Sequence, residues 1–135
     1  MGSIVGYLSY NGVSAAADLS ASQYRAVKWD STERRVAAIT NANAERPVGI
    51  LQDDPDAANK PADVAAFGMC RAQLGGTVTF GDKLACNNSG QLVTDVEVTG
   101  GGAVDLHHIA EALEAGVSGD TVDVFLFNAD RIGAE

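Results

Sequence analysis

Aromatic residues, histidine, cysteine and positive charge are all scarce in this sequence. Of its 135 residues, 6% are Phe, Trp or Tyr, and there are two histidines and two cysteines. Nine Lys and Arg oppose 18 Asp and Glu, which gives a formal net charge of −9. Because phosphate contacts supply most of the affinity for nucleic acids, this balance argues against direct binding of DNA or RNA.

Long apolar runs are also absent. No stretch approaches the roughly 18 apolar residues that span a bilayer, so we expect no membrane partner. The first ten residues have neither a basic region nor a long apolar run, and we expect no signal peptide. Cys70 and Cys86 lie 16 residues apart and form no CxxC motif. This spacing favours two small buried side chains in a reducing cytosol, while a disulfide between them stays open.

The carboxylates and histidines form no recognisable metal site. Asp53, Asp54 and Asp56 could hold a hard cation, but their loop lacks the glycine and the terminal glutamate of an EF-hand. A solvated loop fits them better. His107 and His108 are adjacent and therefore point apart in a helix or a strand, which favours a surface or interface pair over a shared metal. We expect no metal and no cofactor.

No set of residues combines an acid, a base and an electrophile. The nucleophile-elbow motif Gly-x-Ser-x-Gly is absent. Gly100–Gly102 lacks the Lys-Ser/Thr ending of a phosphate-binding loop, and neither cysteine has the basic setting that activates a thiol. Glu111 and Glu114 are typical solvated charges. We therefore expect no enzyme and no catalytic residue.

Short apolar runs separated by turn residues predict a β-rich chain. Asp30–Glu33, Asn88–Gly90 and Ser118–Asp120 have the composition of hairpin turns. The expected strands are Tyr24–Trp29, Arg35–Thr40, Pro47–Gln52, Pro61–Ala72 with a break at Gly68, Thr77–Phe80, Lys83–Asn87, Gln91–Thr94 and Thr121–Phe127. We predict one mostly-β domain over residues 18–127, a compact small β-barrel or β-sandwich of about seven to ten short strands. Residues 1–17 would form an extended N-terminal arm and residues 128–135 a tail.

The segment from residue 106 to residue 115 fits two structures. Leu106, Ile109 and Leu113 have helical spacing, which by itself predicts a helix. The region also echoes an earlier one, because an apolar run, a polar turn and an alternating strand occur over residues 48–67 and again over 109–126. If this echo is a structural repeat, the later segment pairs as a strand.

The N-terminal arm is more apolar than a free tail should be. Ile4, Val5, Tyr7, Leu8 and Tyr10 would leave an exposed apolar patch unless something covers them. We take these five residues as a candidate interface. The alternative is an edge strand that folds back on the same subunit.

Several segments, taken in order, resemble a known family. They are Asp18–Lys28, the Gly-Ile-Leu-Gln run within Pro47–Pro55, Gly75–Val78 with Gly81–Leu84, and Ala110–Ala115 followed by Gly119–Val124. In order and spacing they resemble the capsid decoration, or cement, proteins of phages. The resemblance covers residues 18–127, in which residues 95–106 look like an insertion.

This resemblance implies a function as well as a β-fold. It implies a structural virion protein that binds the outer surface of a phage-type capsid, stabilises the shell and has no enzymatic activity. The implied partner is the major capsid protein, the implied assembly is a homotrimer, and the protein would be made in the host cytoplasm. The resemblance also favours a strand over residues 109–115.

A second function stays open, namely a small β-fold binding module on a virion that recognises carbohydrate or a cell surface. Such a module usually presents a row of exposed aromatic side chains. Trp29, Tyr7, Tyr10 and Tyr24 are scattered along the sequence, which argues weakly against it.

Overall fold

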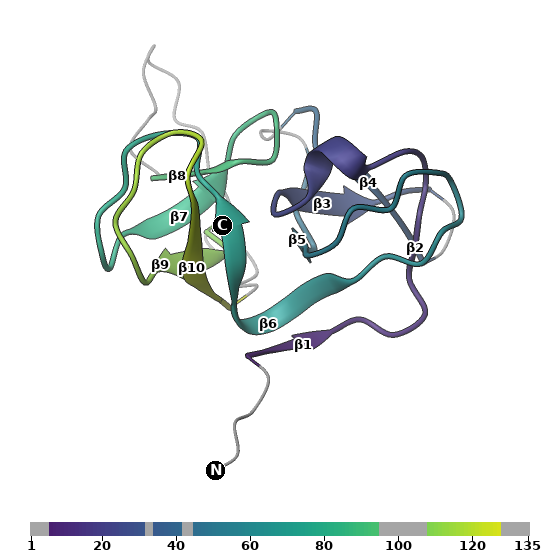
Figure 1. Cartoon of the computed structure of the whole chain (residues 1–135), viewed down its shortest axis with the longest axis horizontal. Coiled ribbons are helices and arrows are strands. Elements are labelled where there is room, and N and C mark those ends of the chain that lie inside the picture. The colour runs from purple at the N-terminus through teal and green to yellow at the C-terminus, as the bar shows by residue number, and fades with distance from the viewer. Residues whose placement is uncertain (1–5, 32–33, 42–44, 95–107, 128–135) are drawn as a thin grey trace, which may run out of the picture.

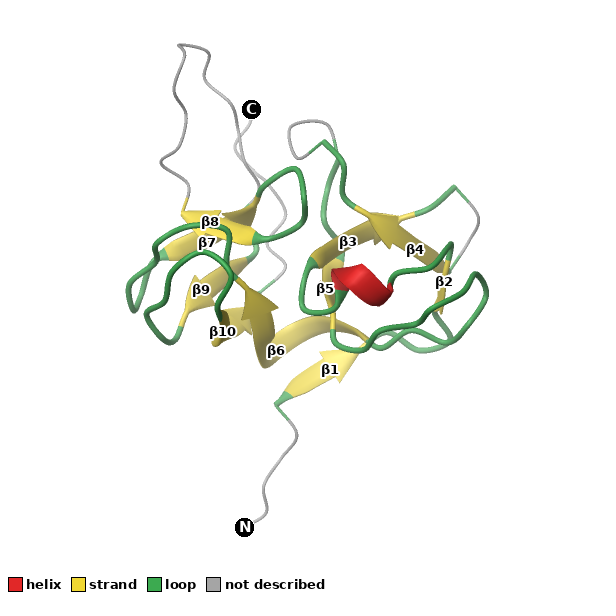
Figure 2. Cartoon of the chain, turned by 45° about the horizontal axis from the view of Figure 1, so that its top comes forward, coloured by secondary structure: helices red, strands yellow, loops and turns green. Residues whose placement is uncertain are grey.

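The computed structural model describes residues 6–31, 34–41, 45–94 and 108–127. The ten strands are β1 (Tyr7–Ser9), β2 (Ser14–Ala15), β3 (Ala26–Trp29), β4 (Arg35–Ala38), β5 (Gly49–Leu51), β6 (Val64–Gln73), β7 (Lys83–Cys86), β8 (Leu92–Thr94), β9 (Ala110–Ala112) and β10 (Thr121–Leu126). A short 3-10 turn, η1 (Ser20–Ser22), precedes β3. The prediction of a mostly-β chain is confirmed (Figure 2). In this part of the chain, no helix is long and apolar enough to cross a membrane.

The ten strands form one sheet. Its order is β2-β4-β3-β5-β6-β10-β9-β7-β8, and β1 pairs with β6 beside this path. The sheet does not close into a barrel, which corrects that half of the predicted architecture. It stays open because other chain segments cover the two end strands. The N–H of Ala15 in β2 donates to Lys60, and the N–H of Gly75 donates to Leu92 in β8.

The two halves of the sheet carry the same pattern of strands. The order β4-β3-β5-β6 in the first half matches β8-β7-β9-β10 in the second, and all these neighbours pair antiparallel. A parallel contact on each hairpin also recurs, since Ala15 pairs with Val36 and Leu74 pairs with Leu92. The chain is therefore built from two copies of one unit, and the repeat suggested by the sequence echo is confirmed.

Strand β6 belongs to both copies, which explains its length of ten residues. It pairs with β5 and β1 near its start and with β10 near its end, and Figure 1 shows it passing from the right half of the molecule to the left. The repeat also decides the ambiguous segment, because Ala110–Ala112 is the strand β9, the counterpart of β5. Pairing with β7 and β10 outweighs the helical spacing of the isolated segment.

The main core is shared by the two copies. Its buried side chains include Ile50 from β5 and Leu84 from β7, and a smaller cluster lies within the first copy. Cys70 and Cys86 are free thiols in the main core, as expected of small buried side chains. Burial raises the pKa of each thiol to about 12, so neither acts as a nucleophile near neutral pH.

The predicted hairpins β3–β4 and β7–β8 and the strand β10 are confirmed, but one predicted strand is wrong. In Thr77–Phe80 only Val78 forms a bridge, to Gly116. The N–H of Thr79 donates to the Asp82 carboxylate at 2.9 Å instead, which closes a turn.

Several segments singled out in the sequence lie outside the described residues. They are the insertion over residues 95–106 with its three glycines, His107 and the tail over 128–135. His108 is half-buried immediately before the buried Ile109.

Part of the segment expected to be an extended arm is paired with the sheet. β1 pairs with β6, so residues 7–9 form an edge strand on their own chain, and β2 pairs with β4. Gly68 permits the close approach of β1. Its φ is +113°, and a Cβ atom there would lie 2.4 Å from the carbonyl oxygen of Gly6.

Candidate interaction surface

Strand β6 turns large apolar side chains outward and small residues inward. Gly68, Cys70 and Ala72 are buried, whereas Phe67 and Met69 are each 48% exposed. Because side chains alternate along a strand, Phe67 and Met69 share one face of the sheet. The central strand of the molecule therefore presents apolar surface to solvent.

Neighbouring strands extend this surface on both sides. Leu8 of β1 lies directly opposite Phe67 and is 69% exposed. Phe125 of β10 lies opposite Met69, and its ring meets the Phe67 ring edge to face at a centroid distance of 5.4 Å. Residues directly opposite on antiparallel strands project to the same side. We call the continuous patch of Leu8, Phe67, Met69 and Phe125 the apolar face.

Charged groups border the apolar face. Arg71 and Asp123 lie opposite each other one step along β6 and β10, and their charged atoms are 3.3 Å apart. Glu111 of β9 lies opposite Phe125. An apolar centre with a charged rim is typical of a protein–protein interface. Single exposed apolar residues are common, but a contiguous patch indicates an interaction site.

Of the described residues in the predicted interface, Leu8 alone belongs to the apolar face. Ile4 and Val5 lie outside the described residues. Whether Ile4, Val5 and Leu8 contact a partner stays a prediction.

The two tyrosines of the predicted interface are half-buried in their own chain. Tyr7 packs against the main core and donates its hydroxyl to Asp63 at 2.6 Å. Burial, together with this bond, raises the pKa of Tyr7. Tyr10 packs against the smaller core cluster and donates to the carbonyl of Val48 at 3.1 Å. Both side chains therefore help to hold β1 and the following segment on the sheet.

Sequence reasoning missed Phe67 and Met69. Residues 64–73 are small or apolar on both faces, so alternation by itself does not say which face is buried. Side-chain size was the available signal, because Gly68, Cys70 and Ala72 fit a crowded interior better than the larger residues between them.

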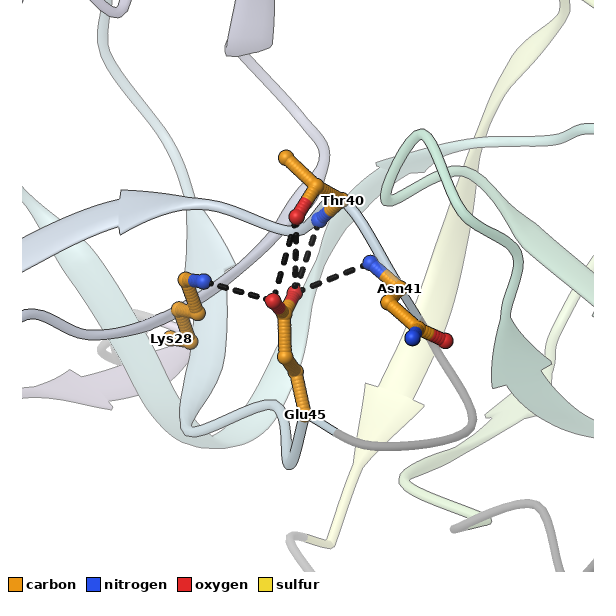
Figure 3. A network of polar contacts seen from close by, with 4 residues as sticks. All are labelled: Lys28, Thr40, Asn41 and Glu45. Carbon is orange, nitrogen blue, oxygen red and sulfur yellow. Dashed lines mark hydrogen bonds and ion pairs between the residues drawn. The ribbon is translucent and has the colours of Figure 1, made fainter.

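A charged network holds the connection between β4 and β5. The Glu45 carboxylate accepts hydrogen bonds from the Lys28 ammonium (2.7 Å) and from the N–H groups of Thr40 (2.8 Å) and Asn41 (3.0 Å) (Figure 3). The Thr40 hydroxyl donates to the same carboxylate at 3.1 Å. The bond from Lys28, followed by the backbone bonds, lowers the pKa of Glu45 to about 2.

Replacing Glu45 by glutamine should lower the Tm at pH 7 by about 2–5 °C, because the charge that these donors stabilise is lost. The folded-state pKa of about 2 lies below the ordinary 4.5, so this stabilisation is present above pH 4.5 and is lost as the pH falls towards 2. Thermal unfolding followed by circular dichroism should therefore show a gap between the two proteins at pH 7 that closes near pH 2. A gap that does not change with pH would contradict this role of Glu45.

The acidic loop after β5 does not gather its carboxylates around one point. Asp53 accepts a hydrogen bond from the N–H of Asp63 at 3.1 Å, and Asp56 pairs with Lys60 at 2.8 Å. The hydrogen bond from Lys60 lowers the pKa of Asp56. Among the described residues, no three His, Cys, Asp or Glu side chains come together as a metal site requires. The loop uses its carboxylates for a turn and an ion pair.

Comparison with known proteins places this fold beside a phage structure. No family model matches the sequence, and a search of curated proteins found no match. Among solved structures, the chain is similar to the head fiber gp8.5 N base of bacteriophage phi29, with a TM-score of 0.61 and 16% sequence identity. The match covers 91% of this chain and 96% of that one. At this identity, the similarity shows a shared fold.

Proposed function

We propose that this chain is a structural protein of a phage virion that binds the outer surface of the capsid and stabilises the shell. The observation that carries this function is the fold shared with a phage head fiber base over nearly the whole of both chains. The segments that resemble capsid decoration proteins support the same role. Such a role needs no catalytic residue and no cofactor.

We assign the contact with the major capsid protein to the apolar face. Leu8, Phe67 and Met69 are half or more exposed, and no described residue shields them further. Full burial of a large apolar side chain contributes about 1.5–3 kcal/mol, so covering these partly exposed residues would contribute several kcal/mol. The charged rim at Arg71 and Asp123 would set the orientation.

An exterior location also fits the charge of the chain. A filled phage head is dense in DNA phosphates, which repel a protein with a net charge of −9. A basic area on the outer capsid would attract the same protein. We therefore propose the outside of the virion, after synthesis in the host cytoplasm.

We also propose that the chain binds as a trimer. A protein that bridges capsid subunits meets the local symmetry axes of the lattice, and a symmetric oligomer suits that geometry. Three linked copies gain avidity, so apolar faces that are weak singly would hold the trimer on the shell.

Co-sedimentation with phage heads tests this function. The full-length protein is added to heads made without it by the phage that encodes it, and heads that already carry the protein serve as the control. We expect saturable binding to the bare heads in multiples of three chains, and a higher temperature of head disruption once they are filled. Absence of binding at a protein concentration of about 10 μM would overturn the proposed function.

A further inference from the structure

Tyr10 and Trp29 form an aromatic ridge at the end of β3. Their rings meet edge to face with centroids 5.1 Å apart, and Trp29 is 41% exposed. The hydrogen bond from the Tyr10 hydroxyl to Val48 fixes the tyrosine ring. These two residues are 19 positions apart in sequence, and the pairing of β1 and β3 with the sheet brings them together.

Two hollows of about 440 Å³ and 420 Å³ border the aromatic ridge. Both are lined by Tyr10 and Trp29, which therefore separate or bound each of them. This size suits one or two rings of a small ligand. The remaining lining residues are Lys28, Glu45, Arg46, Pro47 and Val48 in the first hollow and Asn11, Val13 and Arg34 in the second.

Positive charge gathers at the ridge although the chain is acidic. Three of its nine Lys and Arg line the two hollows, and one carboxylate, Glu45, accompanies them. Glu45 is already paired with Lys28 at 2.7 Å. Arg34 and Arg46 therefore set the local charge. Guanidinium groups bind carboxylates through paired hydrogen bonds, which a single ammonium group does not offer.

The second copy of the repeat carries a different residue at this place. Trp29 lies opposite Val36 on its hairpin, and Cys86 occupies the equivalent position opposite Leu92. Cys86 is only 4% exposed. The repeated unit thus does not require a large exposed aromatic side chain at this position, so Trp29 has a role other than packing of the unit.

We infer that the aromatic ridge binds a sugar that carries a carboxylate, such as a uronic acid unit of a cell-surface polysaccharide. The C–H face of a pyranose ring is apolar and stacks on an exposed indole, whereas its hydroxyl and carboxylate groups need donors at the edge. The indole of Trp29 supplies the first contact, and Arg34 and Arg46 supply the second. This site uses residues outside the apolar face, so it stands or falls independently of capsid binding.

Trp29 is the only tryptophan in the chain, so its fluorescence reports directly on the site. Titration of the full-length protein with trigalacturonic acid should change this fluorescence with a Kd of about 1 mM or tighter. Maltotriose, a neutral sugar of equal length, should bind at least about tenfold more weakly. Arg34→Gln and Arg46→Gln should each weaken binding about fivefold or more, and Arg71→Gln, which removes a cation elsewhere, should not.

Calorimetry with Trp29→Ala and Trp29→Phe separates stacking from charge. The alanine variant should lose binding, and the phenylalanine variant should retain part of it. Equal binding of maltotriose, an equal fluorescence change with sodium acetate alone, or equal affinity in the Arg34, Arg46 and Arg71 variants would each overturn the inference. If Trp29→Ala fails to fold by circular dichroism, the series of exposed arginine variants still decides.

Discussion

Exchanging Phe67 and Met69 together for serine should weaken binding to phage heads by about a hundredfold or more. Both side chains lie at the centre of the apolar face and are half-exposed. Truncating a central apolar anchor commonly costs about 2 kcal/mol of binding free energy, and about 1.4 kcal/mol corresponds to a factor of ten. Two such losses within a trimer reduce avidity further. Because both side chains face solvent, the free energy of unfolding should change by less than about 1 kcal/mol.

Phe80→Ser is the matched control for this variant. Phe80 is 73% exposed and lies in a loop outside the apolar face. It removes a comparable apolar side chain, and its binding to heads should stay within about twofold of the wild type. The measurement is co-sedimentation over a range of protein concentrations, with Tm values as a check on folding. If Phe80→Ser releases the protein while the double variant binds normally, the contact surface is at the other end of the molecule.

Gly68→Ala should lower the free energy of unfolding by about 2–5 kcal/mol. Its φ of +113° is strained for any residue with a side chain, which costs about 1–3 kcal/mol. The new Cβ would also lie 2.4 Å from the Gly6 oxygen and 2.9 Å from the Tyr7 Cα, both backbone atoms of the β1 region. Relief of this clash requires β1 to move off β6. Loss of β1 would expose more of the main core beside Tyr7.

Gly81→Ala separates strain from the clash. Its φ is +88°, but nothing lies within 4 Å of a Cβ atom at this position. We expect a loss of only about 1–2 kcal/mol there, measured for both variants by urea unfolding. Equal losses in the two variants would mean that the close packing of β1 on Gly68 adds nothing to stability.

Hairpins and strand number could be predicted because their signals are local. The polar turn at Asp30–Glu33 and the tight turn at Asn88–Gly90 each separate two short apolar runs, and the runs pair as expected. The echo between residues 48–67 and 109–126 likewise predicted β9, because a repeated unit must place equivalent segments in equivalent pairs. Thr77–Phe80 failed because the Asp82 side chain competes for the backbone of Thr79.

The candidate sites depended on contacts that no local pattern encodes. Leu8 was predicted from the apolar composition of the arm, but its partner Phe67 lies 59 residues away and is set by the register of β1 on β6. Tyr10 and Trp29 were dismissed as scattered, since their contact exists only once β1 and β3 join the same sheet. The open sheet was equally inaccessible, because it depends on chain segments such as Lys60 covering β2.

A cryo-electron microscopy reconstruction of heads that carry this protein tests the account most directly. We predict density for the protein on the outer surface of the shell, grouped in threes at local symmetry axes, with β1, β6 and β10 turned towards the capsid so that Leu8, Phe67 and Met69 are covered. A shell without external density for the protein, or a bound protein whose apolar face is left open to solvent, would contradict the account.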